Sequence, residues 1–557
     1  MTLEHMILKY ALQNAVKFEG KANPGAVMGK VLAEDPSLKA KMKDVNLTIH
    51  KVLKEIHALS VDEQLKQLEA IAPELLEKKE KQERNLFSVF DINPGQKVKS
   101  AFPPGPEKYP HIGHAKGLIL NKMLADQYRG AFVLRFEDTN PSLVKKEFYG
   151  IMLENFEWLG VIPDEVQYAS DHMDLFYKHA EACIKNSNAY VCTCAQDVMK
   201  DNRMKMLACA CRDKNPDRNL KEWKEMPSKK SGDAVLRLKI GLSHQNTTMR
   251  DPVIFRIMDE EHARLGKKYS VWPNYDFQNA IMDGAFNITH RVRTKEFEMR
   301  SELQRYIQDL LKLPRTQTYE LGRFNMEGVE SSGRIIRQLV QEGTLIGWDD
   351  PSLTTIVALR RRGFLPEAIK NFVVSTGITK NDTSMTWDDL IVHNKRILDN
   401  IAPRYFMIHD PMHVEIKGAP IRGIELNLNP NEKAGGRPFQ TNDAFILSRR
   451  DIEECKDDEL MRLMDCLNFV KQGKTLIFKS TDFMEYKKIG KKIMHWLPSK
   501  GNVDIEILMP DKSILRAIAE HNITTLEQGA IIQFERFGFC RLDGKKEDTL
   551  RFWFTHR

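Results

Sequence analysis

Two histidines, His111 and His114, enclose a glycine at position 113 and follow a loop rich in proline and glycine at residues 103–106. Helical periodicity starts at about residue 113, so we expect both histidines at a helix N-terminus, where N–H groups are unpaired and the helix dipole is positive. Imidazoles placed there can donate hydrogen bonds to a phosphate and to the charge that develops as a phosphate leaves. Gly113 lets a nucleotide come close to the backbone. The motif predicts a nucleotide site; two surface histidines at a helix cap are the alternative.

The segments around this motif predict a βαβ unit. Residues 98–102 and 131–136 have the apolar, β-branched and aromatic character of buried strands, and residues 113–128 have helical character. Strand, helix, strand is the start of a parallel sheet of the α/β class. Glu137 follows the second strand, where open α/β sheets bind ligands, and a carboxylate there suits a substrate ammonium group. A helix N-cap or a surface acid is the alternative for Glu137. We expect a further strand at 285–289.

Four cysteines form two C-x-C pairs, Cys192 with Cys194 and Cys209 with Cys211, with fourteen residues between the pairs. Four thiolates from two short turns match a closed, tetrahedral, structural zinc site. Buried free thiols are the alternative, and a redox pair is disfavoured because its usual spacing is C-x-x-C. The pattern predicts a zinc ion bound by all four residues.

The composition is that of a globular protein, with 42% hydrophobic and 29% charged residues, which excludes collagen-like, wholly disordered and disulfide-scaffold proteins. A length of 557 residues corresponds to roughly three to five domains. The net charge, 84 − 77 = +7, permits a polyanionic partner without requiring one. Basic runs at 360–362 and 487–492 are either nucleic-acid contacts or solvated faces. With no membrane-spanning apolar run and no signal-like N-terminus, we expect a cytoplasmic protein without membrane association.

Six regions follow from the periodicity along the chain. We expect a helical N-terminal extension at 1–92, the first half of the parallel-sheet core at 93–170, an insertion with the cysteines at 171–283, the second half of the core at 284–333, a helical region at 334–400, and a region of short strands and turns at 401–557. The charged run at 78–84 reads as an exposed helix end or linker. The short strands indicate an antiparallel barrel or sandwich.

Several segments resemble one known family, the class I aminoacyl-tRNA synthetases of the glutamyl and glutaminyl group. They are Ala101-Phe-Pro-Pro-Gly-Pro-Glu-Lys-Tyr-Pro-His-Ile-Gly-His-Ala-Lys-Gly117, Leu134-Arg-Phe-Glu-Asp-Thr-Asn-Pro141, Val271-Trp-Pro-Asn-Tyr-Asp-Phe-Gln-Asn-Ala-Ile281, Ile288-Thr-His-Arg-Val-Arg-Thr-Lys-Glu-Phe297 and Gln533-Phe-Glu-Arg-Phe-Gly-Phe-Cys-Arg-Leu-Asp543. The resemblance covers the chain except its helical extension, and it is closest to archaeal-type glutamyl-tRNA synthetases. It implies a Rossmann-type core, a zinc-bearing insertion that places the tRNA acceptor end, a helical stem-contact region and an anticodon-binding β-barrel.

The resemblance also implies roles for individual residues. Catalytic roles fall to His111, His114 and Arg334; ATP contacts to His111, Gly113, His114, Thr294, Glu296, Arg323, Phe324, Ser331, Ser332 and Gly333; substrate contacts to Glu137, Tyr275 and Arg293; zinc ligation to Cys192, Cys194, Cys209 and Cys211. Arginine at the position of Arg293 is typical of glutamyl members, and cysteine of glutaminyl members. A guanidinium matches a side-chain carboxylate with two parallel hydrogen bonds.

The implied reaction is a ligation in protein biosynthesis. Glutamate attacks the α-phosphate of ATP, which enters with Mg²⁺, pyrophosphate leaves, and a terminal adenosine hydroxyl of tRNA(Glu), with tRNA(Gln) as a second possible acceptor, takes the glutamyl group. This sequence departs from the family pattern at four positions. Ala101 stands where an arginine is usual, Lys108 where a glycine is usual, and Gly333 and Arg334 where the second signature loop has serine and lysine. The alternatives are a glutaminyl-tRNA synthetase, or a catalytically impaired tRNA-binding paralogue, suggested by Ala101 and Gly333.

Overall fold

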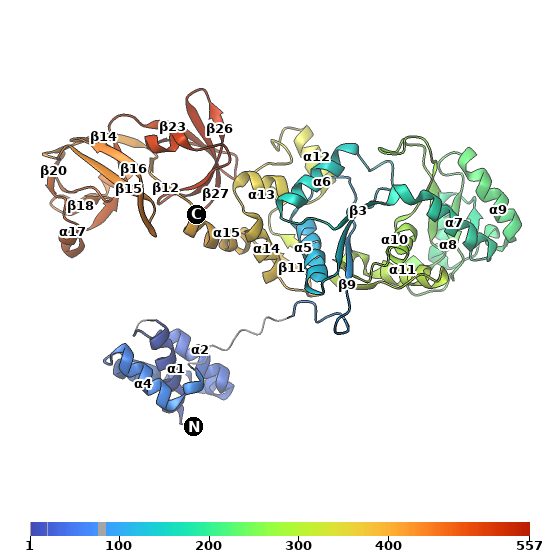
Figure 1. The fold of residues 1–557 in the computed structure, drawn as a ribbon, viewed down its shortest axis with the longest axis horizontal. Coiled ribbons are helices and arrows are strands. Elements are labelled where there is room, and N and C mark those ends of the chain that lie inside the picture. The colour runs from blue at the N-terminus through green and yellow to red at the C-terminus, as the bar shows by residue number, and fades with distance from the viewer. Residues whose placement is uncertain (1, 19, 76–84) are drawn as a thin grey trace. The chain divides into compact units, whose positions relative to one another are not determined.

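The computed structural model describes residues 2–18, 20–75 and 85–557, and it divides into two compact units, Met1–Leu86 and Phe87–Arg557 (Figure 1). The charged run at 78–84 lies outside the described residues. Each unit is described by itself below. In the described ranges no helix has the length and apolarity that crossing a membrane requires.

The N-terminal unit consists of helices, as predicted. They are α1 (Leu3–Lys17), α2 (Pro24–Glu34), α3 (Met42–Ile56) and α4 (Val61–Ile71), with 3₁₀ turns at Pro36–Lys41 and Pro73–Leu75. Ser60 and Glu63 form a capping box at the start of α4, and Asn23 caps α2 ahead of Pro24, so the helix starts are set locally. Ile7, Ala11 and Val45 lie fully buried between the helices.

A five-stranded parallel sheet forms the centre of the second unit, in the order β3-β2-β1-β8-β9. Its strands are β1 (Lys99–Phe102), β2 (Ala131–Phe136), β3 (Glu165–Tyr168), β8 (His290–Thr294) and β9 (Gln317–Leu321). The predicted strand at 131–136 and the α/β class are confirmed. The strand order reverses between β1 and β8, which makes the carboxyl ends of these two strands the place where ligands bind in such sheets.

The strand expected at 285–289 is wrong. Helix α10 (Tyr275–Ala285) ends there, Asn287 adopts a left-handed turn with φ 56°, and β8 begins at His290. Residues 291 and 293 of β8 are arginines that are buried because they pair with acidic and polar side chains. A hydropathy pattern cannot indicate a buried strand that carries two charges.

Helices flank the sheet, and the insertion adds a small antiparallel sheet. The flanking helices are α5 (Ile112–Gln127), α6 (Lys146–Trp158) and α11 (Glu298–Leu310), with 3₁₀ turns at Ala169–His172 and Lys295–Phe297. The insertion sheet contains β4 (Ala189–Cys192), β5 (Val235–Leu238), β6 (Val253–Ile257) and β7 (Val271–Pro273), with helices α7 (Met173–Lys185), α8 (Gln196–Lys205) and α9 (Pro216–Glu225) and 3₁₀ turns at Ala210–Asp213, Met226–Ser228 and Thr247–Met249. Phe255 and Trp272 are fully buried within its core.

A helical region follows the core. It contains α12 (Gly333–Gln341), α13 (Ile356–Arg362), α14 (Pro366–Ser375) and α15 (Trp387–Ile401), and a two-stranded parallel pair of β10 (Phe324–Met326) with β11 (Thr383–Met385). The pairing of β10 with β11 joins the segment that follows the core sheet to the stretch between α14 and α15.

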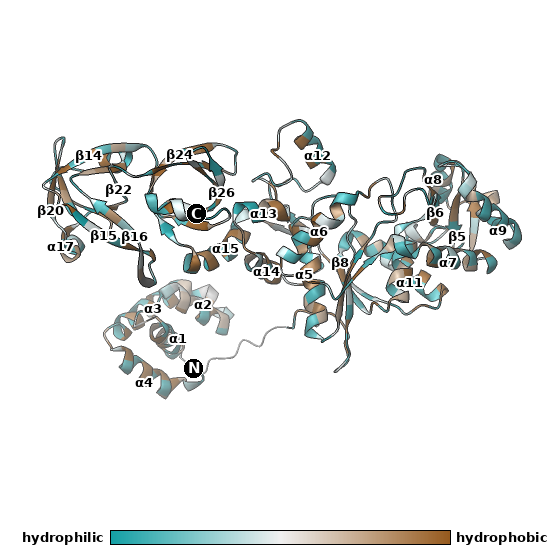
Figure 2. Ribbon diagram, turned by 45° about the horizontal axis from the view of Figure 1, so that its top comes forward, coloured by the Kyte–Doolittle hydropathy of each residue, from teal (hydrophilic) through white to brown (hydrophobic). Residues whose placement is uncertain are grey.

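The C-terminal region holds two seven-stranded sheets and a two-stranded antiparallel sheet of residues 422–429 and 432–441, and each seven-stranded sheet curves toward a closed barrel (Figure 2). The strands are β12 (Arg404–Tyr405), β13 (Met407–Ile408), β14 (Pro411–Lys417), β15 (Arg422–Asn429), β16 (Glu432–Thr441), β17 (Ala444–Ser448), β18 (Leu460–Leu463), β19 (Asn468–Gln472), β20 (Thr475–Ser480), β21 (Lys492–Met494), β22 (Leu497–Pro498), β23 (Val503–Leu508), β24 (Ile514–Ala519), β25 (Ile531–Phe534), β26 (Gly538–Lys546) and β27 (Thr549–His556), with α16 (Arg449–Glu453), α17 (Phe483–Ile489) and a 3₁₀ turn at His521–Thr525. The edge strands of one sheet, β12 and β13, are neighbours in sequence, and so are β21 and β22 of the other. The chain therefore nearly closes each sheet on itself, which hides its edges.

Candidate active site at the switch point of the parallel sheet

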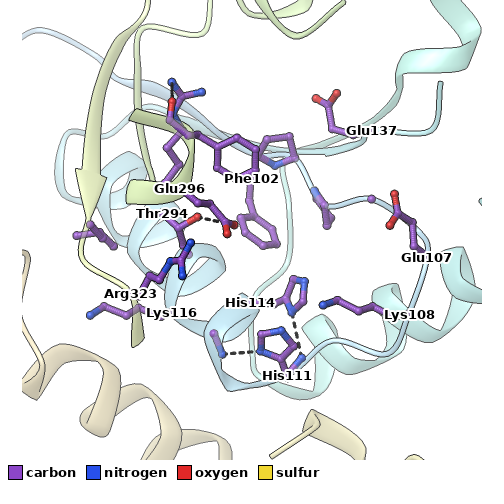
Figure 3. A pocket seen from close by; sticks show the side chains of 18 of the residues that line it. Phe102, Glu107, Lys108, His111, His114, Lys116, Glu137, Thr294, Glu296 and Arg323 are labelled. Atoms are coloured by element: carbon purple, nitrogen blue, oxygen red, sulfur yellow. Dashed lines mark hydrogen bonds between the residues drawn. The ribbon is translucent and has the colours of Figure 1, made fainter. Parts of the chain in front are cut away.

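A cavity of about 780 Å³ lies at the carboxyl ends of β1 and β8, beside the N-terminus of α5 (Figure 3). The residues predicted for nucleotide or substrate that line it are His111, Gly113, His114, Glu137, Tyr275, Arg293, Thr294, Glu296, Arg323, Phe324 and Ser331. Segments more than 150 residues apart in the chain thus meet in one cavity, because the parallel strands bring their ends to the same edge. Ser332, Gly333 and Arg334 lie outside its lining, and Arg334 is exposed.

The histidine pair sits at the start of α5. His111 is the N-cap residue, and its Nδ1 accepts a hydrogen bond from the Gly113 N–H at 3.1 Å. The His111 N–H in turn donates to His114 Nδ1 at 3.2 Å. A ring whose Nδ1 accepts from an N–H carries no proton there, so a neutral ring must carry its proton on Nε2. Both imidazoles therefore have one Nε2–H donor that the backbone does not use.

Burial holds these rings in the neutral form. It lowers the pKa of His111 to about 3, with a smaller contribution from the charge of Lys108, and it lowers the pKa of His114 well below the usual range. Neutral rings at a helix N-terminus can donate to phosphate oxygens without titrating between pH 5 and 8.

Glu137 lies in a buried network of charges. Its Oε1 accepts hydrogen bonds from Arg135 Nε at 2.9 Å and from Asn279 Nδ2 at 3.1 Å, while Asp283 pairs with Arg135 and Arg291. Glu137 Oε2 is buried without a hydrogen-bond partner in the described part of the chain. Burial raises the pKa of Glu137, opposed by the nearby arginine. This carboxylate is fixed by one oxygen and leaves the other to accept a cationic group.

Arg293 lies on β8 and also lines the cavity. Its Nη1 donates to Gln304 at 2.8 Å, its Nη2 contacts Ser301, and Glu320 lies 3.6 Å from Nη2. The Nε–H is buried and has no partner among the described residues. Tyr275, on α10, lines the same cavity and packs against Phe297 with ring centroids 5.3 Å apart. Arg293 is therefore held rigidly, with part of its donor fork already engaged by α11 and β9.

The remaining predicted nucleotide residues gather around β10. Thr294 Oγ1 donates to Glu296 at 3.0 Å, and the backbone N–H of Arg323 donates to Asp382 at 2.7 Å. Ser332 is the N-cap of α12, and Gly333 and Arg334 are that helix's first residues. The loop thus approaches the cavity through Ser331 and then turns away into α12.

Four further cations line the cavity, and the motifs do not single them out as ligand-binding groups: Lys108, Lys116, Arg256 and Arg291, of which Arg291 pairs with Asp283. Lys116 is only 3% exposed, its burial lowers its pKa to about 8, and its Nζ lies 5.2 Å from the centroid of the Phe324 ring. Arg256 has a buried Nε without a partner among the described residues. The two lysines flank the histidine pair in the signature segment, which is a local signal. Arg256 comes from the insertion, and no local pattern places it here.

The four cysteines form one cluster. Their sulfur atoms all lie within 4.8 Å of one another, and Cys192 Sγ is 3.8 Å from Cys209 Sγ. A tetrahedron of zinc–sulfur bonds about 2.3 Å long has sulfur–sulfur edges of about 3.8 Å. Cys192 ends β4, and Cys211 lies in the 3₁₀ turn Ala210–Asp213. The spacing of four uncrosslinked thiols fits a structural zinc ion.

Comparison with known proteins assigns the family. Residues 97–400 match the family described as tRNA synthetases class I (E and Q), catalytic domain, and residues 402–475 and 493–543 match its anti-codon binding domains. Proteins named glutamate–tRNA ligase from Pyrococcus furiosus, Pyrococcus abyssi and Methanocaldococcus jannaschii are 37%, 38% and 36% identical to this chain. Each match covers 100% of both chains. With a matching catalytic region, matching C-terminal regions and relatives of the same length, the chain belongs to the class I tRNA synthetases of the E and Q group.

Proposed function

We propose that the chain is a glutamate–tRNA ligase, which activates L-glutamate with ATP and transfers it to the terminal adenosine of tRNA. The observation that carries the proposal is one cavity that holds two neutral imidazole donors and a buried carboxylate with a free oxygen. The donors suit phosphate and the carboxylate suits an α-ammonium group. Full-length similarity to proteins named glutamate–tRNA ligase supports the same reaction.

Activation joins a carboxylate to a phosphate. A carboxylate oxygen of glutamate attacks the α-phosphorus of ATP, the bond from that phosphorus to the bridging oxygen breaks, and pyrophosphate leaves with Mg²⁺, which enters with ATP as part of the substrate. His111 and His114 donate their Nε2–H groups to oxygens that gain charge in this step. Thr294, Glu296, Arg323, Phe324 and the loop at 331–333 surround the nucleotide, and Arg334 approaches the triphosphate when the loop closes on it.

Transfer needs no protein nucleophile. A terminal hydroxyl of tRNA attacks the glutamyl carbonyl carbon, AMP leaves with the electrons of the acyl–phosphate bond, and the hydroxyl proton passes to the departing phosphate. The cavity contributes by holding the two reactants in position. Residues 402–475 and 493–543 match anti-codon binding domains, which supports a tRNA partner. We assign tRNA(Glu) as the acceptor, and charging of tRNA(Gln) is the second outcome that the assay below tests.

Arg293 is the proposed partner of the glutamate side chain. Its guanidinium is buried and held by Gln304 and Ser301, and its Nε–H is available. A carboxylate accepts a hydrogen bond from that donor, whereas the amide of glutamine brings N–H donors against it. Tyr275 lines the cavity beside it and closes the binding site for the amino acid.

The insertion is proposed to carry a structural zinc ion on Cys192, Cys194, Cys209 and Cys211. When bound, zinc crosslinks the end of β4 to the turn that follows α8, and it takes no part in the reaction. This fixes the surface that we assign to the acceptor end of tRNA.

Two alternatives remain testable. A glutaminyl-tRNA synthetase is disfavoured by Arg293. A catalytically impaired paralogue is favoured by one observation: Ala101 is fully buried against Val133 and Ile288, and it offers no side chain to the cavity.

The test is ATP–pyrophosphate exchange with tRNA present, followed by charging of purified tRNA(Glu) and tRNA(Gln) with labelled glutamate or glutamine. We expect glutamate-dependent exchange and glutamyl-tRNA(Glu). Faster attachment of glutamine at equal concentration would identify a glutaminyl enzyme, and tRNA binding without exchange would identify the impaired paralogue.

A further inference from the structure

Lys108, which lines the cavity, lies directly against Gly333, which is outside the lining. A Cβ atom placed on Gly333 would lie 2.7 Å from Lys108 Cδ and 3.4 Å from Lys108 Cβ. Gly333 has no positive φ, so its backbone conformation does not require glycine. A side chain at 333 would therefore require the stem of Lys108 to move from its present position.

Among the described residues the ammonium of Lys108 has no direct partner, although the nearby carboxylates of Glu107 and Glu296 favour its charged form. Among the described residues its Nζ makes no hydrogen bond and no ion pair within 4.0 Å, although it lines the cavity. Figure 3 shows the side chain extending toward the imidazole of His114. Its charge lowers the pKa of both His111 and His114, which is a second sign that it lies beside them. This half-buried ammonium lies beside two imidazoles that can donate hydrogen bonds to phosphate, and it has no hydrogen bond or ion pair among the described residues. It can therefore bind an anion.

The loop that carries Lys108 is anchored on both sides. Pro106 O accepts a hydrogen bond from the Lys145 N–H at 3.1 Å, and Glu107 O accepts one from Arg337 at 3.3 Å. Tyr109 stacks on Trp348 with ring centroids 5.2 Å apart. These contacts fix the backbone of Lys108 before substrate binds, so little conformational entropy is lost when its ammonium binds an anion.

Arg334 is placed differently. It is exposed, it lies outside the cavity lining, and it belongs to the first turn of α12. Lys108 is therefore a cation that already lines the cavity near the histidine pair, whereas Arg334 must move to reach the same place.

We propose that Lys108 binds the ATP phosphates that leave as pyrophosphate, and that Gly333 lacks a side chain so that Lys108 can occupy this position. The proposal rests on the proposed function, and it adds a catalytic residue and a positioning residue to it. Lys108 offsets the negative charge that grows on the leaving group, beside the two imidazole donors. Gly333 acts only through Lys108.

The test is a double-mutant cycle of Lys108→Met and Gly333→Ala in the full-length protein, with Lys108→Arg as the conservative variant. Lys146→Met, an exposed lysine at the start of α6, is the matched control. Exchange rates, KM for ATP and KM for pyrophosphate are measured, with circular dichroism to check folding.

We expect Lys108→Met to slow exchange about 10- to 1000-fold and to raise the KM for pyrophosphate, as the loss of one charge-stabilising donor does. Lys108→Arg should keep most of the activity, and Lys146→Met all of it. Gly333→Ala should slow the wild-type protein and have no further effect in the Lys108→Met background. Wild-type behaviour of a folded Lys108→Met protein would overturn the role of Lys108, and an equal effect of Gly333→Ala in both backgrounds would overturn the role of Gly333.

Binding of pyrophosphate and of ATP by titration calorimetry, without amino acid or tRNA, separates this inference from the proposed function. Weaker binding by folded Lys108→Met supports the phosphate contact even in a protein that shows no exchange, in which case only the ligase proposal fails. Unchanged affinity for both ligands in an active enzyme would overturn the contact while leaving the ligase proposal intact.

Discussion

Arg361 and Asp543 form a two-point ion pair between residues 182 positions apart. Arg361 Nε donates to Asp543 Oδ1 at 2.8 Å and Nη2 to Oδ2 at 2.7 Å, while Nη1 contacts Asp349 at 2.6 Å. The guanidinium also lies 4.2 Å from the Trp553 ring centroid. This arginine joins α13 to β26. Two residues of the basic run at 360–362 thus serve the fold, because Arg362 also bonds to a distant strand: it is buried and donates to Thr555 O at 2.9 Å.

Loss of this pair should loosen the junction between the helical region and the barrels. Arg361→Lys keeps the charge and loses the fork, so we expect a coupling energy of about 1 kcal/mol between positions 361 and 543 in a double-mutant cycle with Asp543→Asn. Thermal unfolding measures it. The coupling should shrink in 1 M salt, since both side chains are partly exposed. Additive effects of the two substitutions would contradict the pair's contribution.

Zinc should be bound by the cysteine cluster alone. Freshly prepared protein, never exposed to chelator, should carry about one equivalent of zinc by elemental analysis. Cys211→Ser should lose the metal and lower the unfolding temperature. Cys183 is the control, because it is buried in the insertion core outside the cluster. Metal-free wild-type protein, or equal zinc loss in Cys183→Ser, would remove the assignment.

Arg293→Ala should weaken glutamate binding. Removal of a buried charged donor costs about 1.5–3 kcal/mol, which corresponds to a rise of roughly 10- to 150-fold in the KM for glutamate. The KM for ATP should change little, and zinc content should stay the same. Arg305→Ala on the exposed side of α11 controls for loss of positive charge. If the KM for glutamate rises equally in both variants, Arg293 has no specific role.

His114→Ala should lower the rate of activation about 100- to 1000-fold, with a smaller change in the KM for ATP, because a donor to the developing charge is lost. The wild-type pH profile should show no inflection near 6.5. Burial lowers the pKa of His111 to about 3 and that of His114 well below its usual range, so both rings stay neutral above about pH 5. An inflection near 6.5 that disappears in His114→Ala would show that this ring titrates.

Lys116 should make ATP binding sensitive to alkaline pH. Its burial lowers its pKa to about 8, so the free protein loses this charge as the pH rises through that value. The dissociation constant of ATP should therefore increase between pH 8 and 9.5, and bound phosphate should move the transition upward by favouring the ammonium form. Lys116→Arg should flatten the profile, because guanidinium stays charged. Identical profiles for both proteins would exclude Lys116.

The sequence by itself determined the parts of this protein that depend on local spacing. His111 and His114 are three residues apart and cap one helix, and each C-x-C pair occupies one short turn, so their chemistry is visible in a few residues. The apolar runs at 98–102 and 131–136 likewise predicted β1 and β2, since strand burial imposes such runs. The family resemblance added residues that local spacing alone leaves as surface groups, Arg293 among them.

Only the tertiary structure decided which distant groups meet and which charges remain free. The contact of Lys108 with Gly333 and the pairing of Arg361 with Asp543 join positions that no local period relates. Arg256 reaches the cavity from the insertion. The misplaced strand at 285–289 has the same origin, because β8 buries two arginines whose partners lie on other elements. Burial of a charge is favourable only when its partner is in place, and that partner is supplied by the fold.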